Sequence, residues 1–223
     1  MTHSYRGFSE PLAQMIDPTR TALLVIDAQV DFASPDGALA RAGADLSGAQ
    51  ATLGRVAALA DAARRAGATL AFVRLQTRPD TDSRALRLLN ARRGGAPADI
   101  ALCREGGPGE AHVAVAPAAG EIEVVKRLYD AFYGSDLEPR LRGRGVDTLV
   151  VVGFSTHCCV DATCRAAFHR DFNVFVVSDA TDAYDADLQR VTLRALAETC
   201  ALVVAADEVL ERIPVSRHRI RSW

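Results

Sequence analysis

The stretch TLVVVGFSTHCCVDAT (residues 148–163) runs from an apolar segment through a turn into a helix-like segment. Thr148–Gly153 is rich in Val, as is typical of a parallel strand that is covered on both faces. The turn leads into Asp161–His169, so a cysteine lies where a helix begins. Backbone amides and the positive end of the helix dipole stabilise a thiolate there, and they can also hold an oxyanion. The stretch therefore indicates an α/β fold and points towards covalent catalysis by cysteine.

Strand-like and helix-like segments alternate along the rest of the chain. The predicted strands are Ala22–Asp27, Thr69–Leu75, Glu123–Val125, Thr148–Gly153, Val174–Ser178 and Ala201–Ala205. The predicted helices are Ala51–Ala66, Leu137–Arg144, Asp161–His169 and Leu188–Thr199. This order predicts a doubly wound, mostly parallel sheet of the Rossmann type, with helices on both faces in three layers. Arg78–Gly120 is broken by Gly and Pro, and we expect it to be mostly loop, either a lid or a subunit contact.

The composition narrows the classes of protein to consider. With 223 residues, of which 49% are hydrophobic, the chain can bury one substantial core, so we expect a single domain over residues 1–223. The net charge of -2 gives no basic footprint for nucleic acid. No apolar run approaches the roughly 20 residues that span a bilayer, and residues 1–20 lack the apolar region of a signal peptide. We therefore expect a cytoplasmic enzyme with no membrane partner.

The chain has five cysteines, at positions 103, 158, 159, 164 and 200. Their odd number and irregular spacing argue against a disulfide framework in a chain of this length. Paired Cys-x-x-Cys units are missing, which argues against a structural zinc site. We expect Cys164 and Cys200 to be small buried side chains without a chemical role.

Three chemically useful residues follow predicted strands. Asp27 ends the first strand, Lys126 follows a middle strand, and Cys159 follows the turn after Gly153. Open α/β sheets bind ligands at the carboxyl ends of their strands. The pattern therefore predicts that these three residues converge at one edge of the sheet.

Three segments of the chain resemble one known family. They are LLVIDAQVDF (residues 23–32), VVK with AFYGSDL (residues 124–126 and 131–137), and the segment from Gly153 to Thr163. In this order they are similar to the isochorismatase-like cysteine hydrolase superfamily, which includes nicotinamidases, carbamoylsarcosine amidases and biuret hydrolases. The three segments span most of the chain, and their joint occurrence is highly specific.

The resemblance implies a catalytic triad. Cys159 would be the nucleophile, Asp27 the acid and base, and Lys126 the cation between them. The amides of Ser155 and Cys159 would form the oxyanion hole, beside a cis peptide bond between Phe154 and Ser155. The resemblance also implies a homo-oligomer, either a dimer or a tetramer.

Two adjacent cysteines compete for the role of nucleophile. The family pattern Gly-x-x-Thr-x-x-Cys-Val-x-x-Thr fits Gly153, Thr156 and Cys159 without a gap, so we assign the role to Cys159. The role of Cys158 stays open. His157 is an improbable base, because adjacent side chains on a turn generally diverge and a base must reach its proton.

Candidate substrate-binding residues lie next to these segments. Arginines just past a strand end suit a carboxylate or a carbonyl of the substrate, although a surface role is equally consistent. Phe32 is equally consistent with the core. The candidates are Gln29, Phe32, Arg74, Gln76, Arg78, Tyr133 and Thr156.

The segment after the second predicted strand contains no histidine. Many microbial nicotinamidases bind a divalent metal there through histidines, whereas Val73–Asp82 offers only carboxylates. We therefore expect no metal and no cofactor. The leading interpretation is a metal-independent amidohydrolase that cleaves a C–N bond of a small amide, carbamoyl or ureide substrate. The alternatives are a metal-free nicotinamidase-like enzyme, a non-catalytic binding protein on the same fold, and a redox sensor based on Cys158, Cys159 and Cys164.

Overall fold

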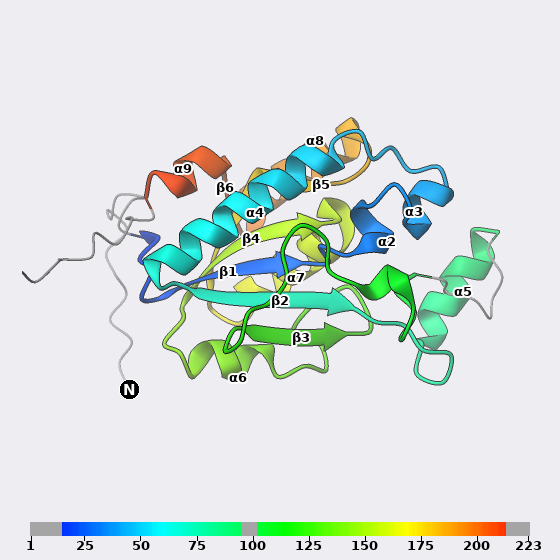
Figure 1. Ribbon diagram of the computed structural model, residues 1–223, viewed down its shortest axis with the longest axis horizontal. Coiled ribbons are helices and arrows are strands. Elements are labelled where there is room, and N and C mark those ends of the chain that lie inside the picture. Colours follow the sequence, from blue (N-terminus) through cyan, green and yellow to red (C-terminus); the bar gives the residue numbers. More distant parts are fainter. Residues whose placement is uncertain (1–14, 95–101, 213–223) are drawn as a thin grey trace, which may run out of the picture.

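Six strands form one sheet in the order β3–β2–β1–β4–β5–β6, and every pairing between them is parallel (Figure 1). The computed structural model describes residues 15–94 and 102–212. The strands are β1 Thr21–Ile26, β2 Thr69–Leu75, β3 Ile122–Lys126, β4 Thr148–Phe154, β5 Asn173–Asp182 and β6 Leu202–Val204. Each lies within a few residues of a predicted strand, and the parallel doubly wound sheet is confirmed.

Helices cover both faces of the sheet. The α-helices are α2 Val30–Ala33, α3 Ala38–Arg41, α4 Ala49–Ala66, α5 Arg84–Arg92, α6 Leu137–Arg142, α7 Asp161–Phe168, α8 Ala186–Thr199 and α9 Ala206–Leu210. A short 3₁₀-helix spans Pro108–Glu110, and a π-helical turn spans Thr156–Val160. Helices α4 and α9 pack on one face, and α6, α7 and α8 pack on the other (Figure 1). The three layers are therefore those that the sequence predicts.

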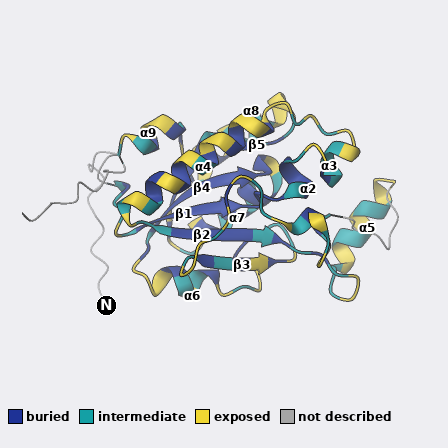
Figure 2. Ribbon diagram, in the orientation of Figure 1, coloured by how far each residue is buried: buried dark blue, intermediate teal, exposed yellow. Residues whose placement is uncertain are grey.

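Successive side chains of each strand point to opposite faces of the sheet, so two separate hydrophobic cores form, one on each face. In β1, Leu23 and Val25 join the core under α4, whereas Leu24 and Ile26 join the core on the opposite face. All six residues of β1 are buried, because this strand lies in the interior of the sheet (Figure 2). Burial on both faces explains why the central strands read as continuous apolar runs rather than as alternating patterns.

The expectation that Arg78–Gly120 is mostly loop overlooked a helix. Helix α5 occupies Arg84–Arg92, and the side-chain oxygen of Ser83 accepts a hydrogen bond from the backbone amide of Leu86 at its N-terminus. Residues 95–101 of this stretch lie outside the described residues. The capping serine is the local signal that could have revealed α5.

Gly153 lets β4 approach β1 where both strands end. It has a φ of 113°, and a Cβ at this position would lie 1.9 Å from the carbonyl oxygen of Ile26. Ile26 and Gly153 are paired in the parallel register of the two strands. The glycine therefore sets the position at which the chain leaves the sheet beside Asp27 and enters the turn that carries Cys159.

Asp31 joins loops that lie far apart in the sequence. Its carboxylate accepts hydrogen bonds from the amide of Ala38, at 2.9 Å, and from the amide of Cys103, at 2.6 Å. A Cβ at Gly109 would lie only 2.0 Å from this carboxylate, so the loop of Gly109 packs directly against it. The buried acid thus fixes the loops that border the carboxyl ends of β1 and β2.

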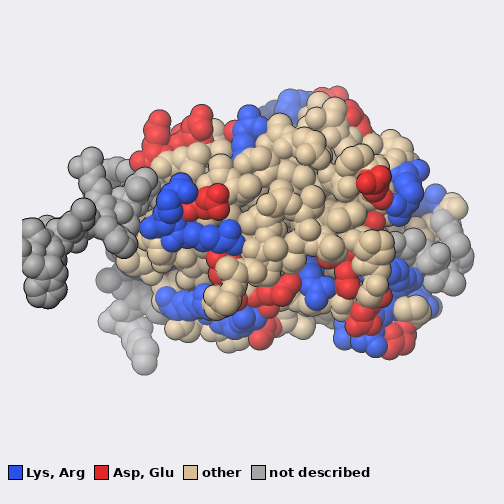
Figure 3. All heavy atoms as spheres, in the orientation of Figure 1, with Lys and Arg blue, Asp and Glu red and all other residues tan. Residues whose placement is uncertain are grey.

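The face of the molecule in Figure 3 carries charges of both signs, with basic groups beside Asp and Glu. Salt bridges pair opposite charges in the described part of the chain, for example Arg64 with Glu121 and Arg104 with Asp82. Within residues 15–94 and 102–212, none of the helices has the length and apolarity that crossing a bilayer requires.

We expect Gly153→Ala to lower the free energy of unfolding by about 1–3 kcal/mol, because its Cβ meets the Ile26 carbonyl and its φ disfavours a side chain. Gly54→Ala is the matched control. Gly54 lies within α4 with no atom near its added Cβ, so this change should stabilise the protein by about 1 kcal/mol. Urea denaturation of both variants checks the prediction, and equal effects would contradict the role assigned to Gly153.

Candidate active site

Asp27 is the first residue after β1, and it is fully buried. Its backbone is in the left-handed region, with φ 47°, and its amide donates a hydrogen bond to the carbonyl of Val73 in β2. An aspartate tolerates this conformation better than most residues. The turn therefore places a carboxylate directly at the carboxyl end of the sheet.

Lys126 is the last residue of β3, and its ammonium group is completely buried. Its Nζ lies 2.7 Å from Oδ2 of Asp27 and 3.2 Å from Sγ of Cys159. It also donates a hydrogen bond to the carbonyl of Leu128, at 3.0 Å. One cation thus contacts both other members of the group that the sequence predicts to converge.

Cys159 lies in the π-helical turn between β4 and α7, and 2% of its surface is exposed. The carbonyl of Ser155 accepts hydrogen bonds from the amides of Cys158 and Val160, which close the turn. The peptide bond between Phe154 and Ser155 is cis, as the family resemblance implies. The turn continues directly into α7, so the thiol lies at the N-terminal side of that helix.

Burial and charge act against each other in this cluster. Burial raises the pKa of Asp27 above its ordinary value, and the ammonium of Lys126 offsets part of that effect. Burial alone would lower the pKa of Lys126, but the carboxylate of Asp27 raises it above its ordinary value. A hydrogen bond with Cys158, burial and the charge of Asp27 together raise the pKa of the Cys159 thiol. At neutral pH Cys159 is therefore a thiol at rest, beside the ammonium of Lys126.

The two residues before Cys159 are more exposed than Cys159 itself. Cys158 is half-buried, and His157 is exposed. Burial and the positive charge of Arg93 lower the pKa of His157, so its imidazole is neutral at pH 7. The contacts of the buried cluster join Cys159 to Lys126, and through it to Asp27, rather than to His157.

Two of the candidate substrate-binding residues make contacts within the fold. The side-chain amide of Gln29 donates to the carbonyls of Leu75 and Glu110 and accepts from the amide of Leu75, which ties β2 to the loop beyond it. Phe32 is buried in the core under α4. Neither side chain offers a free group to a ligand in this arrangement.

The candidates that follow β2 are engaged with carboxylates. Arg74 contacts Glu110 and Glu123, and Gln76 donates to Glu110 at 2.7 Å. Arg78 makes salt bridges with exposed acids nearby. The pairings of Arg74 and Gln76 with Glu110 span more than 30 residues of sequence, so no local pattern reveals them.

The remaining candidates lie closer to the cluster. Thr156 is fully buried in the turn of Cys159, and its hydroxyl has no hydrogen-bond partner among the described residues. Ser155 is also buried and begins the same turn. Tyr133 is 67% exposed, in the loop between β3 and α6. Thr163 in α7 anchors this loop, because its hydroxyl accepts a hydrogen bond from the amide of Ala131.

A pocket of about 400 Å³ lies between α5 and the loop after β3, and Asp27, Lys126 and Cys159 are not among its lining residues. One wall is α5, and the other is the loop after β3, which includes the Lys126-bound Leu128. The α7 residue Ala162 also lines the pocket, three positions after Cys159. Its lining residues are Ser83, Ala85, Leu86, Leu89, Leu128, Tyr129, Asp130, Tyr133 and Ala162. Of these, the sequence singled out only Tyr133 as a substrate-binding candidate.

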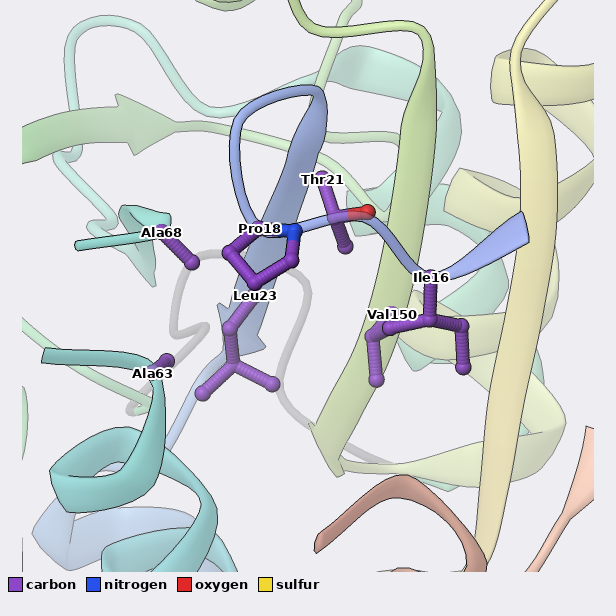
Figure 4. Close-up of a pocket in the computed structure, with 7 residues that line it drawn as sticks. All are labelled: Ile16, Pro18, Thr21, Leu23, Ala63, Ala68 and Val150. Atoms are coloured by element: carbon purple, nitrogen blue, oxygen red, sulfur yellow. The ribbon is translucent and has the colours of Figure 1, made fainter. Parts of the chain in front are cut away.

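A second, small cavity lies at the opposite ends of the strands. Aliphatic side chains from the start of β1, from β4 and from the turn between α4 and β2 surround it, including Leu23, Val150 and Ala68 (Figure 4). It contains none of the residues of the Asp27 cluster. Its apolar lining marks it as a packing space between the sheet and α4.

Donor atoms for a metal are sparse in the described part of the chain. No group of three or more His, Cys, Asp or Glu side chains there is arranged to hold a metal ion. The five cysteines are all unpaired thiols.

The sequence matches one known protein family and is similar to proteins that carry a functional name. The profile of the Isochorismatase domain family matches residues 21–208. The ureidoacrylate amidohydrolase RutB of Methylobacterium radiotolerans is 37% identical over 182 residues, which cover 77% of this chain and 70% of that protein. RutB of Variovorax paradoxus is 36% identical over 189 residues, which cover 77% of this chain and 71% of that protein.

Solved structures agree with these sequence matches. A cysteine hydrolase from Pseudomonas syringae superposes with a TM-score of 0.75 and 32% identity, covering 92% of this chain and 98% of that one. N-carbamoylsarcosine amidase from Thermoplasma acidophilum superposes with a TM-score of 0.65 and 26% identity, covering 84% and 97% of the two chains. The fold and the family resemblance seen in the sequence are thus confirmed.

We expect alkylation of Cys159 by iodoacetamide to rise with pH around a midpoint above the value of about 8.5 for a free thiol, because burial and Asp27 oppose the thiolate. Asp27→Asn removes the anion and should move the midpoint to lower pH. Tandem mass spectrometry separates Cys159 from Cys158, and circular dichroism checks that the variant folds. A midpoint that stays in place or rises in Asp27→Asn would contradict the assigned electrostatics.

Proposed function

The chain belongs to the isochorismatase family, and we propose that it is an amidohydrolase that cleaves a C–N bond of a small ureide or amide through Cys159. One observation carries this proposal. A buried ammonium, Lys126 Nζ, contacts both the thiol of Cys159 and the carboxylate of Asp27. The two RutB relatives described above are named ureidoacrylate amidohydrolases, and this favours a ureide over nicotinamide as the substrate.

The first half-reaction forms a covalent bond between Sγ and the substrate carbonyl carbon, which gives an S-carbamoyl group from a ureide or a thioester from an amide. The Sγ of Cys159 attacks the carbonyl carbon of the substrate, and its proton passes to Asp27 as the S–C bond forms. The carbonyl electrons move onto oxygen, and the amides of Ser155 and Cys159 stabilise this oxyanion. The C–N bond then breaks, and Asp27 returns the proton to the departing amine.

The second half-reaction restores the thiol. Water attacks the carbonyl carbon bound to Sγ and gives a proton to Asp27, and the C–S bond breaks to release a carbamic acid from a ureide or a carboxylic acid from an amide. The Cys159 sulfur recovers its proton from Asp27. Lys126 stays charged throughout and stabilises whichever of its two neighbours is anionic. No step requires a metal ion, so metal independence is part of the proposal.

The pocket between α5 and the loop after β3 supplies the route to the thiol. Leu86 and Leu128 make part of its wall apolar, while Tyr129 and Tyr133 bring hydroxyl groups. A site of this kind suits a small polar molecule with a short carbon segment. The free hydroxyl of Thr156 supplies a further hydrogen-bonding group beside Cys159.

We also propose that the protein is a single domain that acts in the cytoplasm as a homo-oligomer. Five free thiols suit a reducing compartment. Exposed apolar side chains, including Leu88, Phe168 and Val191, offer surface for contact between copies of the chain.

We expect Cys159→Ala to lower kcat/KM for the best ureide on the order of 10⁴-fold or more, because the covalent route is lost. Cys158→Ala should keep most of the activity, and Cys200→Ala, at the end of α8, should leave it unchanged. Ammonia release from 3-ureidoacrylate, biuret, N-carbamoylsarcosine and nicotinamide provides the assay. Activity that survives in Cys159→Ala would overturn the mechanism, and inactivity on every compound would overturn the ureide assignment.

Exhaustive dialysis against a chelator should leave kcat and KM within about twofold of their starting values, because every step is assigned to protein groups. The same ammonia assay measures this, with a metal-dependent amidase as the positive control. Loss of activity that added Zn²⁺ or Mn²⁺ restores would show that metal independence is wrong.

A further inference from the structure

The pocket between α5 and the loop after β3 is joined to the nucleophile through Lys126. The Nζ of Lys126 lies 3.0 Å from the carbonyl oxygen of Leu128, which lines the pocket, and 3.2 Å from Sγ of Cys159. Ala162 also lines the pocket, from the first turn of α7, directly after the turn that carries Cys159. A substituent of a substrate whose carbonyl group is held at the thiol is therefore within reach of this pocket.

Hydrogen bonds hold the loop that forms one wall of the pocket. The amide of Ala131 donates to the hydroxyl of Thr163 in α7, at 3.1 Å. The amide of Phe132 donates to Oδ1 of Asp130, at 2.8 Å, and the carbonyl of Leu128 is held by the buried ammonium. This wall is therefore formed before a ligand binds, which lowers the entropic cost of binding.

The lining of the pocket is mostly apolar. Helix α5 contributes Leu86 and Leu89, and the opposite wall adds Leu128 and the rings of Tyr129 and Tyr133. Helix α5 lies wholly within the described residues, and none of its residues is buried, so its leucines are not committed to the core. Apolar surface of this kind favours a ligand group that also leaves water when it binds.

The charge in the lining is negative. Among the described residues, the lining holds one charged side chain, Asp130, and neither Lys nor Arg. Within residues 15–94 and 102–212, the carboxylate of Asp130 makes one hydrogen bond, with the amide of Phe132, and no ion pair. An anionic group in this pocket would lose its water and meet a like charge, and both effects oppose its binding.

We propose that this pocket binds an uncharged, apolar substituent of the substrate, such as a branched alkyl or phenyl group, while the ureide or amide carbonyl lies at Cys159. A volume of about 400 Å³ leaves room for a substituent of this size. This inference rests on the proposed function and names its substrate class, neutral ureides and amides rather than acidic ones. The RutB relatives are named for ureidoacrylate, an anion, so this chain differs from them in the substituent that it prefers.

The first test compares three ureides of the same shape. N-(3-methylbutyl)urea, 3-ureidopropionamide and 3-ureidopropionate end in an apolar, a neutral polar and an anionic group. In the ammonia assay, kcat/KM for the apolar ureide should exceed that for the acid by about tenfold or more, mainly through KM, with the amide between them. Equal values for the apolar ureide and the acid, or a preference for the acid, would overturn the proposal.

Substitutions in the lining should change this preference. Leu89→Lys places an ammonium in the apolar wall and should lower the ratio of kcat/KM for the apolar ureide to that for the acid by about tenfold. Ala91→Lys adds the same charge to α5 two positions later, outside the lining, and should change the ratio less than about threefold. Equal changes of the ratio in the two variants would contradict the role of the pocket.

Asp130→Asn removes the like charge and keeps an oxygen that can accept the hydrogen bond from the amide of Phe132. It should raise kcat/KM for the acid by about three- to tenfold and leave the apolar ureide nearly unchanged. Asp136→Asn, in the same loop but outside the lining, is the matched control and should alter neither value. An acid that gains nothing in Asp130→Asn would contradict the electrostatic part of the proposal.

A binding experiment separates the pocket from the reaction. Isothermal titration calorimetry with Cys159→Ala should show that N-(3-methylbutyl)urea binds about tenfold more tightly than 3-ureidopropionate, and that adding Leu89→Lys removes this difference. Equal affinities for the two ureides in Cys159→Ala would overturn the proposal. The expected difference, found for a native protein that hydrolyses no ureide or amide, would keep the apolar pocket and reject only the proposed reaction.

Discussion

The buried ammonium of Lys126 is the constraint on which the rest of the site depends. It contacts a carboxylate and a thiol in a region that excludes water, and each of these groups would be costly to bury alone. Removing one partner of a buried ion pair typically costs about 3–5 kcal/mol, because the other charge is left uncompensated. The cluster therefore holds together as a unit, and its charge balance limits which group can carry a proton at each stage.

The side chains of Asp27, Lys126 and Cys159 come from segments that lie far apart in the sequence. Strand β2 separates β3 from β1, so the long side chain of Lys126 must reach across the end of β2 to Asp27. The close approach at Gly153 brings the turn of Cys159 to the same edge. Gln29 and Asp31, four residues or fewer from Asp27, fix the surrounding loops through backbone amides and carbonyls. The short segment after β1 thus carries both Asp27, a member of the cluster, and two residues that hold the surrounding loops in place.

The sequence predicts the sheet well and the surface of the pocket poorly, for a physical reason. Strands buried on both faces leave continuous apolar runs, and parallel strands end at one edge, which is why the meeting of Asp27, Lys126 and Cys159 could be foreseen. The pairing of Arg74 with Glu110 depends on a loop 36 residues away, and no local pattern encodes it. Helix α5 was missed for a different reason, since the Gly and Pro residues that follow it favour a loop and outweighed the capping signal of Ser83. The roles of the site residues in catalysis stay predictions.

The central claim is that the reaction passes through a covalent bond at Cys159. Rapid quenching of the native enzyme during turnover of a ureide, followed by peptide mass spectrometry, tests this most directly. The account predicts a transient carbamoyl group on Cys159 that appears before product accumulates and disappears when substrate is exhausted. An adduct on another residue, or steady turnover with Cys159 unmodified throughout, would contradict it.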